Sequence, residues 1–325
     1  MTPRHFLTTL IAGLTSVTLL VTPEAVRAQA VVPRVPPIEP EQLEQQGLVL
    51  WQQAAQLAQI QQFESAIPLA QLAAQLANDI PEVWLLLGQL YLQVGELQPS
   101  VIALEKARSL NPEDSVALFN LGDVYFRLED YQKSIEYLES GLDASPEVAG
   151  AWFDLANAYY KLNRYEQAID RYEEAVDLEE DFWFAINNIG LVLYEKGDVD
   201  EAIDRWEDAV AMTEETEAEP LMAIAVAQFA QGEQDAAVAQ AIAALRLDFR
   251  YADLEFLEVN LWGPKLLAQT EQLLNLPEVR RSLRQLRFQT NTAAEVAPEA
   301  PSETPSETPS GVPVDPAPAP AAPLE

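Results

Sequence analysis

The sequence predicts an all-α protein built from repeated pairs of helices. Hydrophobic residues make up 49% of the 325 residues, whereas glycine occurs only 12 times. This composition favours helices packed on helices over a β-sheet protein. A pattern of large and small residues also returns every 34 residues, with units starting at 81, 115, 149 and 183. Self-similarity at a fixed period of this length is typical of repeat architectures.

Each repeat unit contains two helices that the sequence allows to pack closely. In the unit 81–114, Trp84, Leu87 and Tyr91 share one helical face, and Pro112 ends the second helix. Small residues occupy the eighth and twentieth positions of every unit, where they let two helices approach near the minimum interaxial distance. They are Ala54, Gly88, Gly122, Ala156, Gly190 and Ala225 at the eighth position, and Ala66, Ser100, Ser134, Ala168, Ala202 and Ala237 at the twentieth. The pattern predicts six units at 47–80, 81–114, 115–148, 149–182, 183–217 and 218–250.

This pattern resembles the tetratricopeptide-repeat family, and the resemblance covers about residues 47–250. It implies a right-handed superhelical solenoid in which the first helices of the units line a groove for a protein or peptide. The family's groove positions correspond here to Phe119, Asp123, Phe126, Phe153, Asn157, Tyr160, Phe184, Asn187 and Tyr194. The alternative is that some of these rings pack between units. The family's clamp for a terminal carboxylate is not expected, because Leu85, Phe119 and Phe153 stand where it requires lysine.

The N-terminus resembles a signal peptide. Arg4 precedes an apolar stretch at residues 6–21, and Ala28-Gln29-Ala30 provides a small-x-small cleavage site, so residues 1–30 are expected to be removed and the chain exported. The alternative is that residues 6–21 remain as a membrane anchor. Residues 31–46 are expected to form a proline-rich linker and the start of the first helix.

The C-terminal part is predicted to consist of helices that cap the repeats, followed by a disordered tail. Residues 251–290 are expected to form helices that cover the last repeat, with Pro277 in the first turn of the last one. On that helix Arg280, Arg284 and Arg287 share a face, which is either solvated or a docking patch. Residues 291–325 are rich in Pro, Ala, Ser, Thr and Glu and are expected to form a disordered tail.

The composition argues against several classes of function. A net charge of −33 opposes binding to nucleic acid, and to a membrane unless the N-terminal segment is retained. The chain has no cysteine and a single histidine, within residues 1–30, which excludes thiolate and imidazole catalysis and zinc sites in the exported form. The carboxylates Asp200, Asp204 and Glu207 are expected to form a solvated face. No enzyme activity, metal or cofactor is predicted.

The expected function is that of a non-catalytic scaffold for a protein or peptide partner outside the cytoplasm. The signal segment, the acidic repeats and the segment Asn260–Gly263 resemble secreted or lumenal tetratricopeptide proteins of cyanobacteria and plastids. That resemblance implies the periplasm or the thylakoid lumen, and a role in assembling an envelope or photosynthetic membrane complex. The alternatives are an accessory subunit or enzyme of envelope polysaccharide metabolism, which would need two facing carboxylates, and a self-assembling structural protein of the envelope.

Overall fold

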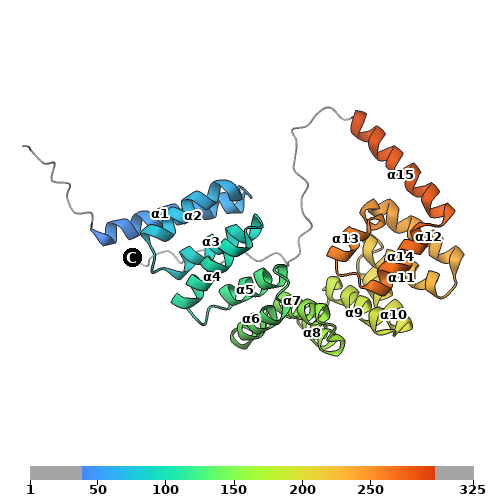
Figure 1. The fold of residues 1–325 in the computed structure, drawn as a ribbon, viewed down its shortest axis with the longest axis horizontal. Coiled ribbons are helices and arrows are strands. Elements are labelled where there is room, and N and C mark those ends of the chain that lie inside the picture. The colour runs from blue at the N-terminus through green and yellow to red at the C-terminus, as the bar shows by residue number, and fades with distance from the viewer. Residues whose placement is uncertain (1–38, 297–325) are drawn as a thin grey trace, which may run out of the picture. The chain divides into compact units, whose positions relative to one another are not determined.

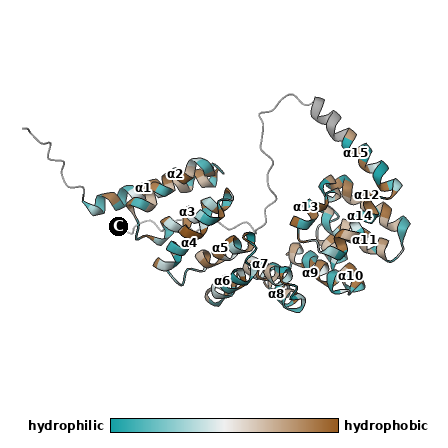
Figure 2. Ribbon diagram, viewed as in Figure 1, coloured by the Kyte–Doolittle hydropathy of each residue, from teal (hydrophilic) through white to brown (hydrophobic). Residues whose placement is uncertain are grey.

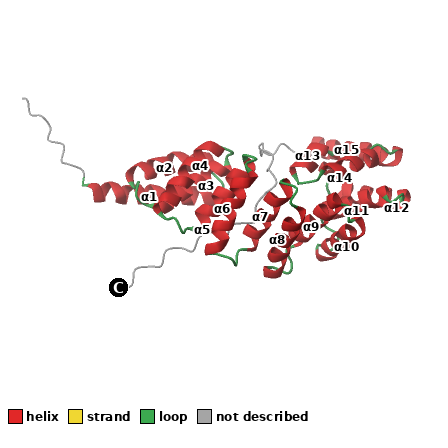
Figure 3. Cartoon of the chain, turned by 60° about the horizontal axis from the view of Figure 1, so that its bottom comes forward, coloured by secondary structure: helices red, strands yellow, loops and turns green. Residues whose placement is uncertain are grey.

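The computed structural model of the protein describes residues 39–296, and side chains as far as residue 288. The predicted signal segment, most of the linker and residues 297–325 of the predicted tail lie outside the described residues. Within the described range every regular element is a helix, and Figure 3 shows helices joined by loops. No helix of this range is both long enough and apolar enough to cross a membrane.

The first twelve helices form six consecutive pairs (Figure 1). The pairs are α1 (Pro40–Gln59) with α2 (Phe63–Leu76), α3 (Pro81–Gln93) with α4 (Leu97–Leu110), α5 (Ser115–Arg127) with α6 (Tyr131–Ala144), α7 (Ala149–Lys161) with α8 (Tyr165–Leu178), α9 (Trp183–Lys196) with α10 (Val199–Met212), and α11 (Ala218–Ala230) with α12 (Gln234–Leu247). Each helix packs mainly on its own pair partner and next on the neighbouring pair. This arrangement confirms the predicted all-α, helix-pair repeat fold.

The small residues at the eighth position are required by the packing inside each pair. A Cβ atom added at Gly88 would lie 2.5 Å from Leu104 Cγ, and one added at Gly122 would lie 2.5 Å from Leu138 Cγ. At Gly190 the neighbour is the indole of Trp206, with Cδ1 2.7 Å away. The second helix of each of these pairs therefore inserts a large side chain where the first helix has none. Figure 2 shows that hydrophobic and hydrophilic residues alternate along the helices of the pairs.

The turn inside each pair places one residue in the left-handed backbone region. Gly95, Gly197 and Gly232 have φ of 75°, 109° and 89°. The equivalent residues in the other three pairs are Gln61, Glu129 and Asn163, with φ of 57–60°. Because side chains disfavour this region, the three non-glycine turns carry a small conformational cost that the glycine turns avoid.

The C-terminal helices do more than cover the last pair. The short helices η1 (Phe249–Ala252) and α13 (Leu254–Val259) lead into α14 (Pro264–Leu274) and α15 (Pro277–Val296). Helix α15 packs on α12, in line with a cap on the last repeat, but α14 packs on α9 and α11, the first helices of two successive pairs. Leu266, Thr270 and Leu273 form the fully buried face of α14. The sequence predicted helices over residues 251–290 that cover the last repeat, and the packing of α14 on α9 in the pair before it was not expected.

Candidate functional site

The nine predicted groove residues lie on α5, α7 and α9, on one face of the first helices, which we call the first-helix face. Their burial divides them into two groups. Asn157, Tyr160, Asn187 and Tyr194 are buried, so these four pack inside the protein. The accessible group consists of Phe119, Asp123, Phe126 and Phe153, which are half-buried, and Phe184, which is 49% exposed. The accessible group is the candidate surface.

The accessible rings are held in place by neighbouring aromatic groups. Phe153 lies between Tyr172 and Phe182, with centroid separations of 5.5 and 5.2 Å. Phe184 stacks on Trp183 at 3.8 Å, and Phe182 contacts its edge at 6.3 Å. Sequence reasoning did not single out Trp183 or Phe182, because they lie at the junction of two units rather than at a groove position. These contacts fix the rings, so a partner would meet a preformed aromatic surface.

A small charged group accompanies the rings. Arg127 donates two hydrogen bonds to Asp123, from Nε to Oδ1 at 2.9 Å and from a terminal nitrogen to Oδ2 at 3.2 Å. Asp154, from the neighbouring first helix α7, has no hydrogen bond or ion pair with any described residue. Burial raises the pKa of Asp154 to about 8, and the charge of Asp123 adds to this, whereas Arg127 opposes it. Arg127 lies at a groove position and Asp154 on the same helical face, so a complete survey of that face would have found both.

The buried amides belong to a structural network. The hydroxyl of Tyr172 donates to Oδ1 of Asn157 at 2.5 Å, and Nδ2 of Asn188 donates to the same oxygen at 3.2 Å. Nδ2 of Asn187 donates to Oδ1 of Asn188 at 3.2 Å. These bonds link α7, α8 and α9, so Asn157 and the amide nitrogen of Asn187 are engaged inside the protein.

Helix α14 covers the first-helix face at α9 and α11. The carboxylate of Glu195 accepts hydrogen bonds from the backbone N–H groups of Lys265 at 3.2 Å and Leu266 at 2.9 Å, at the start of α14. The hydroxyl of Tyr194 bonds to Gln269, and the Lys265 ammonium bonds to the carbonyl of Glu195. A Cβ atom at Gly263 would lie within 2.6 Å of Glu195 Oε1. The accessible surface is therefore confined to the pairs before α9 and the first turn of α9.

Trp262 and Tyr251 hold the segment before α14 through a second carboxylate, that of Glu219. Nε1 of Trp262 donates to the buried Glu219 at 3.0 Å, and the hydroxyl of Tyr251 donates to the second oxygen at 3.4 Å. Burial raises the pKa of Glu219 to about 7, although the bonds from Trp262 and Asn187 oppose the rise. The segment 249–275 is thus anchored to the first-helix face by both carboxylates, Glu195 and Glu219.

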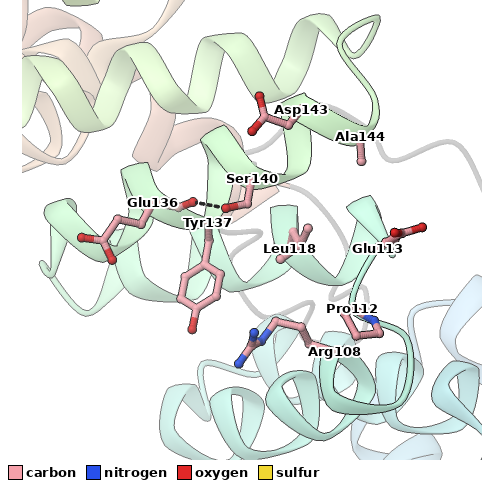
Figure 4. A pocket seen from close by; sticks show the side chains of 9 residues that line it. All are labelled: Arg108, Pro112, Glu113, Leu118, Glu136, Tyr137, Ser140, Asp143 and Ala144. Carbon is pink, nitrogen blue, oxygen red and sulfur yellow. Dashed lines mark hydrogen bonds between the residues drawn. The ribbon is translucent and has the colours of Figure 1, made fainter.

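A hollow lies elsewhere, between α4 and α6 (Figure 4). It has a volume of about 750 Å³ and contains none of the predicted residues. Arg108 on its wall is held by Glu105 at 2.7 Å, and Ser140 donates to the carbonyl of Glu136 at 2.7 Å. Some of the polar groups that line the hollow are thus already bonded to neighbouring residues of the same helix. No group of three or more His, Cys, Asp or Glu residues in the described range is placed to hold a metal ion.

The helix pairs and the shared first-helix face define a helical-repeat protein. A family model described as tetratricopeptide repeat matches residues 85–149, 119–186, 153–220 and 187–253. These overlapping matches together cover just over half of the chain. The chain therefore belongs to the tetratricopeptide repeat family.

Solved structures with similar folds share little sequence with the chain. PilF of Pseudomonas aeruginosa is 16% identical, with a TM-score of 0.55, covering 67% of this chain and 98% of its own. MamA of Desulfovibrio magneticus RS-1 is 21% identical, with a TM-score of 0.50, covering 52% and 96%. YrrB, described as a repeat protein with an unusual peptide-binding site, is 20% identical, with a TM-score of 0.46, covering 59% and 97%. No curated protein matches the chain.

Proposed function

We propose that the protein is a non-catalytic scaffold that binds a protein or peptide segment on the accessible part of the first-helix face. One observation carries the proposal: Phe184 is 49% exposed, and the ring of Phe182 joins it to the half-buried ring of Phe153, with centroid separations of 6.3 and 5.2 Å. Aromatic side chains on a fixed and partly desolvated surface are the usual anchors of protein interfaces. Membership of the tetratricopeptide repeat family supports a binding role over a catalytic one.

The charged group favours a particular kind of segment. Asp123 is already paired with Arg127, whereas Asp154 has no cationic partner among the described residues. A lysine or arginine of the bound segment would lower the raised pKa of Asp154 and pair with the carboxylate, while apolar side chains cover the rings. The proposed ligand is therefore a segment that combines apolar residues with a basic one.

The proposed location is outside the cytoplasm, in the periplasm or the thylakoid lumen. Support comes from the sequence, where Arg4, the apolar residues 6–21 and Ala28-Gln29-Ala30 follow the order of a signal peptide. A role in assembling an envelope or photosynthetic membrane complex belongs to the same proposal and is supported by the resemblance to lumenal and secreted repeat proteins. N-terminal sequencing of the native protein tests it, because an intact Met1 in a soluble cytoplasmic fraction would contradict export.

The binding surface is tested by site-specific photocrosslinking in the native cell. A photoreactive phenylalanine analogue at Phe184 is compared with the same analogue at Phe249, which is 46% exposed on η1, away from the accessible rings. The proposal expects a defined crosslinked partner from position 184 and none from position 249. The same products from both positions, or none from either, would count against the surface.

A further inference from the structure

The last helix has two chemically different faces. Val279 is fully buried and Leu283 is half-buried, where α15 packs on α12 and α14. Arg280, Arg284 and Arg287 lie on the other face and are exposed. None of these three arginines forms a hydrogen bond or ion pair with a described residue. They form a stripe with spacings of four and three residues, which we call the arginine stripe.

The arginine stripe is unusual in this chain because carboxylates are plentiful. The chain has 52 acidic and 19 basic residues, yet these guanidinium groups have no carboxylate partner in the described range. Arg281 lies beside them and is also exposed, whereas Glu278 is the one acidic residue between 277 and 288. The surface of α15 is therefore locally positive on a strongly negative protein.

Helix α8 carries a stripe of the opposite charge with the same spacing. Asp170, Glu174 and Asp177 are exposed, and they too are separated by four and then three residues. None of the three forms a hydrogen bond or ion pair with a described residue. Both stripes span about 10 Å along their helices, at 1.5 Å per residue. On α10, Asp200, Asp204 and Glu207 repeat the spacing, but Asp200 already accepts a hydrogen bond from Gln231 at 2.9 Å.

We propose that the arginine stripe of one molecule binds the α8 carboxylate stripe of a second copy. The matched spacing lets each guanidinium meet one carboxylate when the two helices run in the same direction. Because the two stripes are different surfaces of the same chain, the contact is head-to-tail and leaves one stripe free at each end. Such contacts build open chains or closed rings rather than two-fold dimers.

The net charge of −33 sets the salt dependence of this contact. At low ionic strength, repulsion between two whole molecules acts over distances longer than the stripes and opposes association. Near 0.15 M salt the screening length falls to about 8 Å, which weakens the long-range repulsion while the ion pairs in contact persist. At about 1 M salt the ion pairs are also screened. Association is therefore strongest at intermediate ionic strength.

The test uses two charge-reversed forms of the full chain. One carries Arg280→Glu, Arg284→Glu and Arg287→Glu, and the other carries Asp170→Lys, Glu174→Lys and Asp177→Lys. Self-association is measured by sedimentation velocity over about 1–200 µM protein, a range suited to weak contacts. Each variant alone should associate at least tenfold more weakly than the wild type. An equimolar mixture should associate again, because each reversed stripe then faces an opposite charge.

A matched control separates the contact from the change in net charge. The variant with Lys161→Glu, Arg164→Glu and Arg246→Glu removes three other exposed cations and has the same net charge as the arginine-stripe variant. It should retain wild-type association. Circular dichroism of all variants establishes that they are folded.

Two outcomes would overturn the proposal. The first is a wild-type chain that stays monomeric at every salt concentration. If that monomer binds vesicles of anionic lipid through the arginine stripe, a membrane surface is the partner instead. The second is a mixture of the two variants that fails to associate although each is folded.

Discussion

Replacing Asp154 by asparagine should stabilise the protein at alkaline pH. The pKa of Asp154 is raised from 3.8 to about 8, so the folded state binds its proton more tightly than the unfolded state does. The stabilisation from this proton is complete below about pH 4 and is lost as the pH rises through about 8. Asparagine has nearly the same shape but does not ionise, so the variant does not lose this stabilisation at high pH.

The size of the effect follows from the pKa shift. At 1.36 kcal/mol per pKa unit, a shift from 3.8 to about 8 sets an upper limit of roughly 6 kcal/mol. Asp154 is only half-buried, and water reduces the cost of its charge, so we expect about 1–3 kcal/mol. Other groups titrate in the same range, including Glu219, and the comparison with the wild type at each pH cancels them.

The measurement is urea unfolding of the wild type and Asp154→Asn at intervals from pH 4 to pH 9. The difference in unfolding free energy should be near zero at pH 4 and should rise to favour the variant by about 1–3 kcal/mol at pH 9. A difference that does not change with pH would refute the raised pKa of Asp154. If the proposed basic ligand is correct, the same variant should bind the partner more weakly while being more stable.

Three further predictions concern the surface and the repeat packing. Phe184→Ala should weaken binding of the crosslinked partner at least tenfold at high salt, whereas Phe249→Ala should leave the affinity unchanged; calorimetry with the purified partner compares them. Gly190→Ala should lower the unfolding free energy by about 1–3 kcal/mol, because the added methyl group displaces the buried indole of Trp206, and unchanged stability would show that the pair can separate freely. Glu129→Gly should raise the unfolding free energy by about 0.5–1 kcal/mol, because φ there is 60°, and a decrease in urea denaturation would contradict the turn geometry.

The repeat fold was predictable because the residues that determine how each helix pair packs lie within a single repeat unit. The small residue at position eight, as at Gly122, and the turn glycine, as at Gly197, can be recognised without knowing the rest of the structure. The surface was less predictable, because burial depends on neighbours from other units. Asn157 and Tyr194 occupy groove positions in the sequence pattern, yet Tyr172 engages the first and α14 covers the second.

The location of α14 could not be derived from the repeat pattern, which ends near residue 250. Its apolar residues predict a helix whose apolar face packs on another part of the protein. Both the end of the last repeat and the first-helix face could provide that packing surface. The choice depends on Glu195, whose carboxylate bonds to the start of α14. In the sequence, Glu195 is simply one of many acidic residues.

Because α14 covers part of the first-helix face, the number of repeats does not by itself determine how long a bound segment could be. Six helix pairs are present among the described residues, but the part of the first-helix face open to the proposed partner ends at the start of α9, since α14 packs on α9 and α11. Gly263 is the residue that permits this, because a single methyl group there would collide with Glu195. The close packing at one glycine outside the repeats therefore bears on how long a segment the proposed surface could hold.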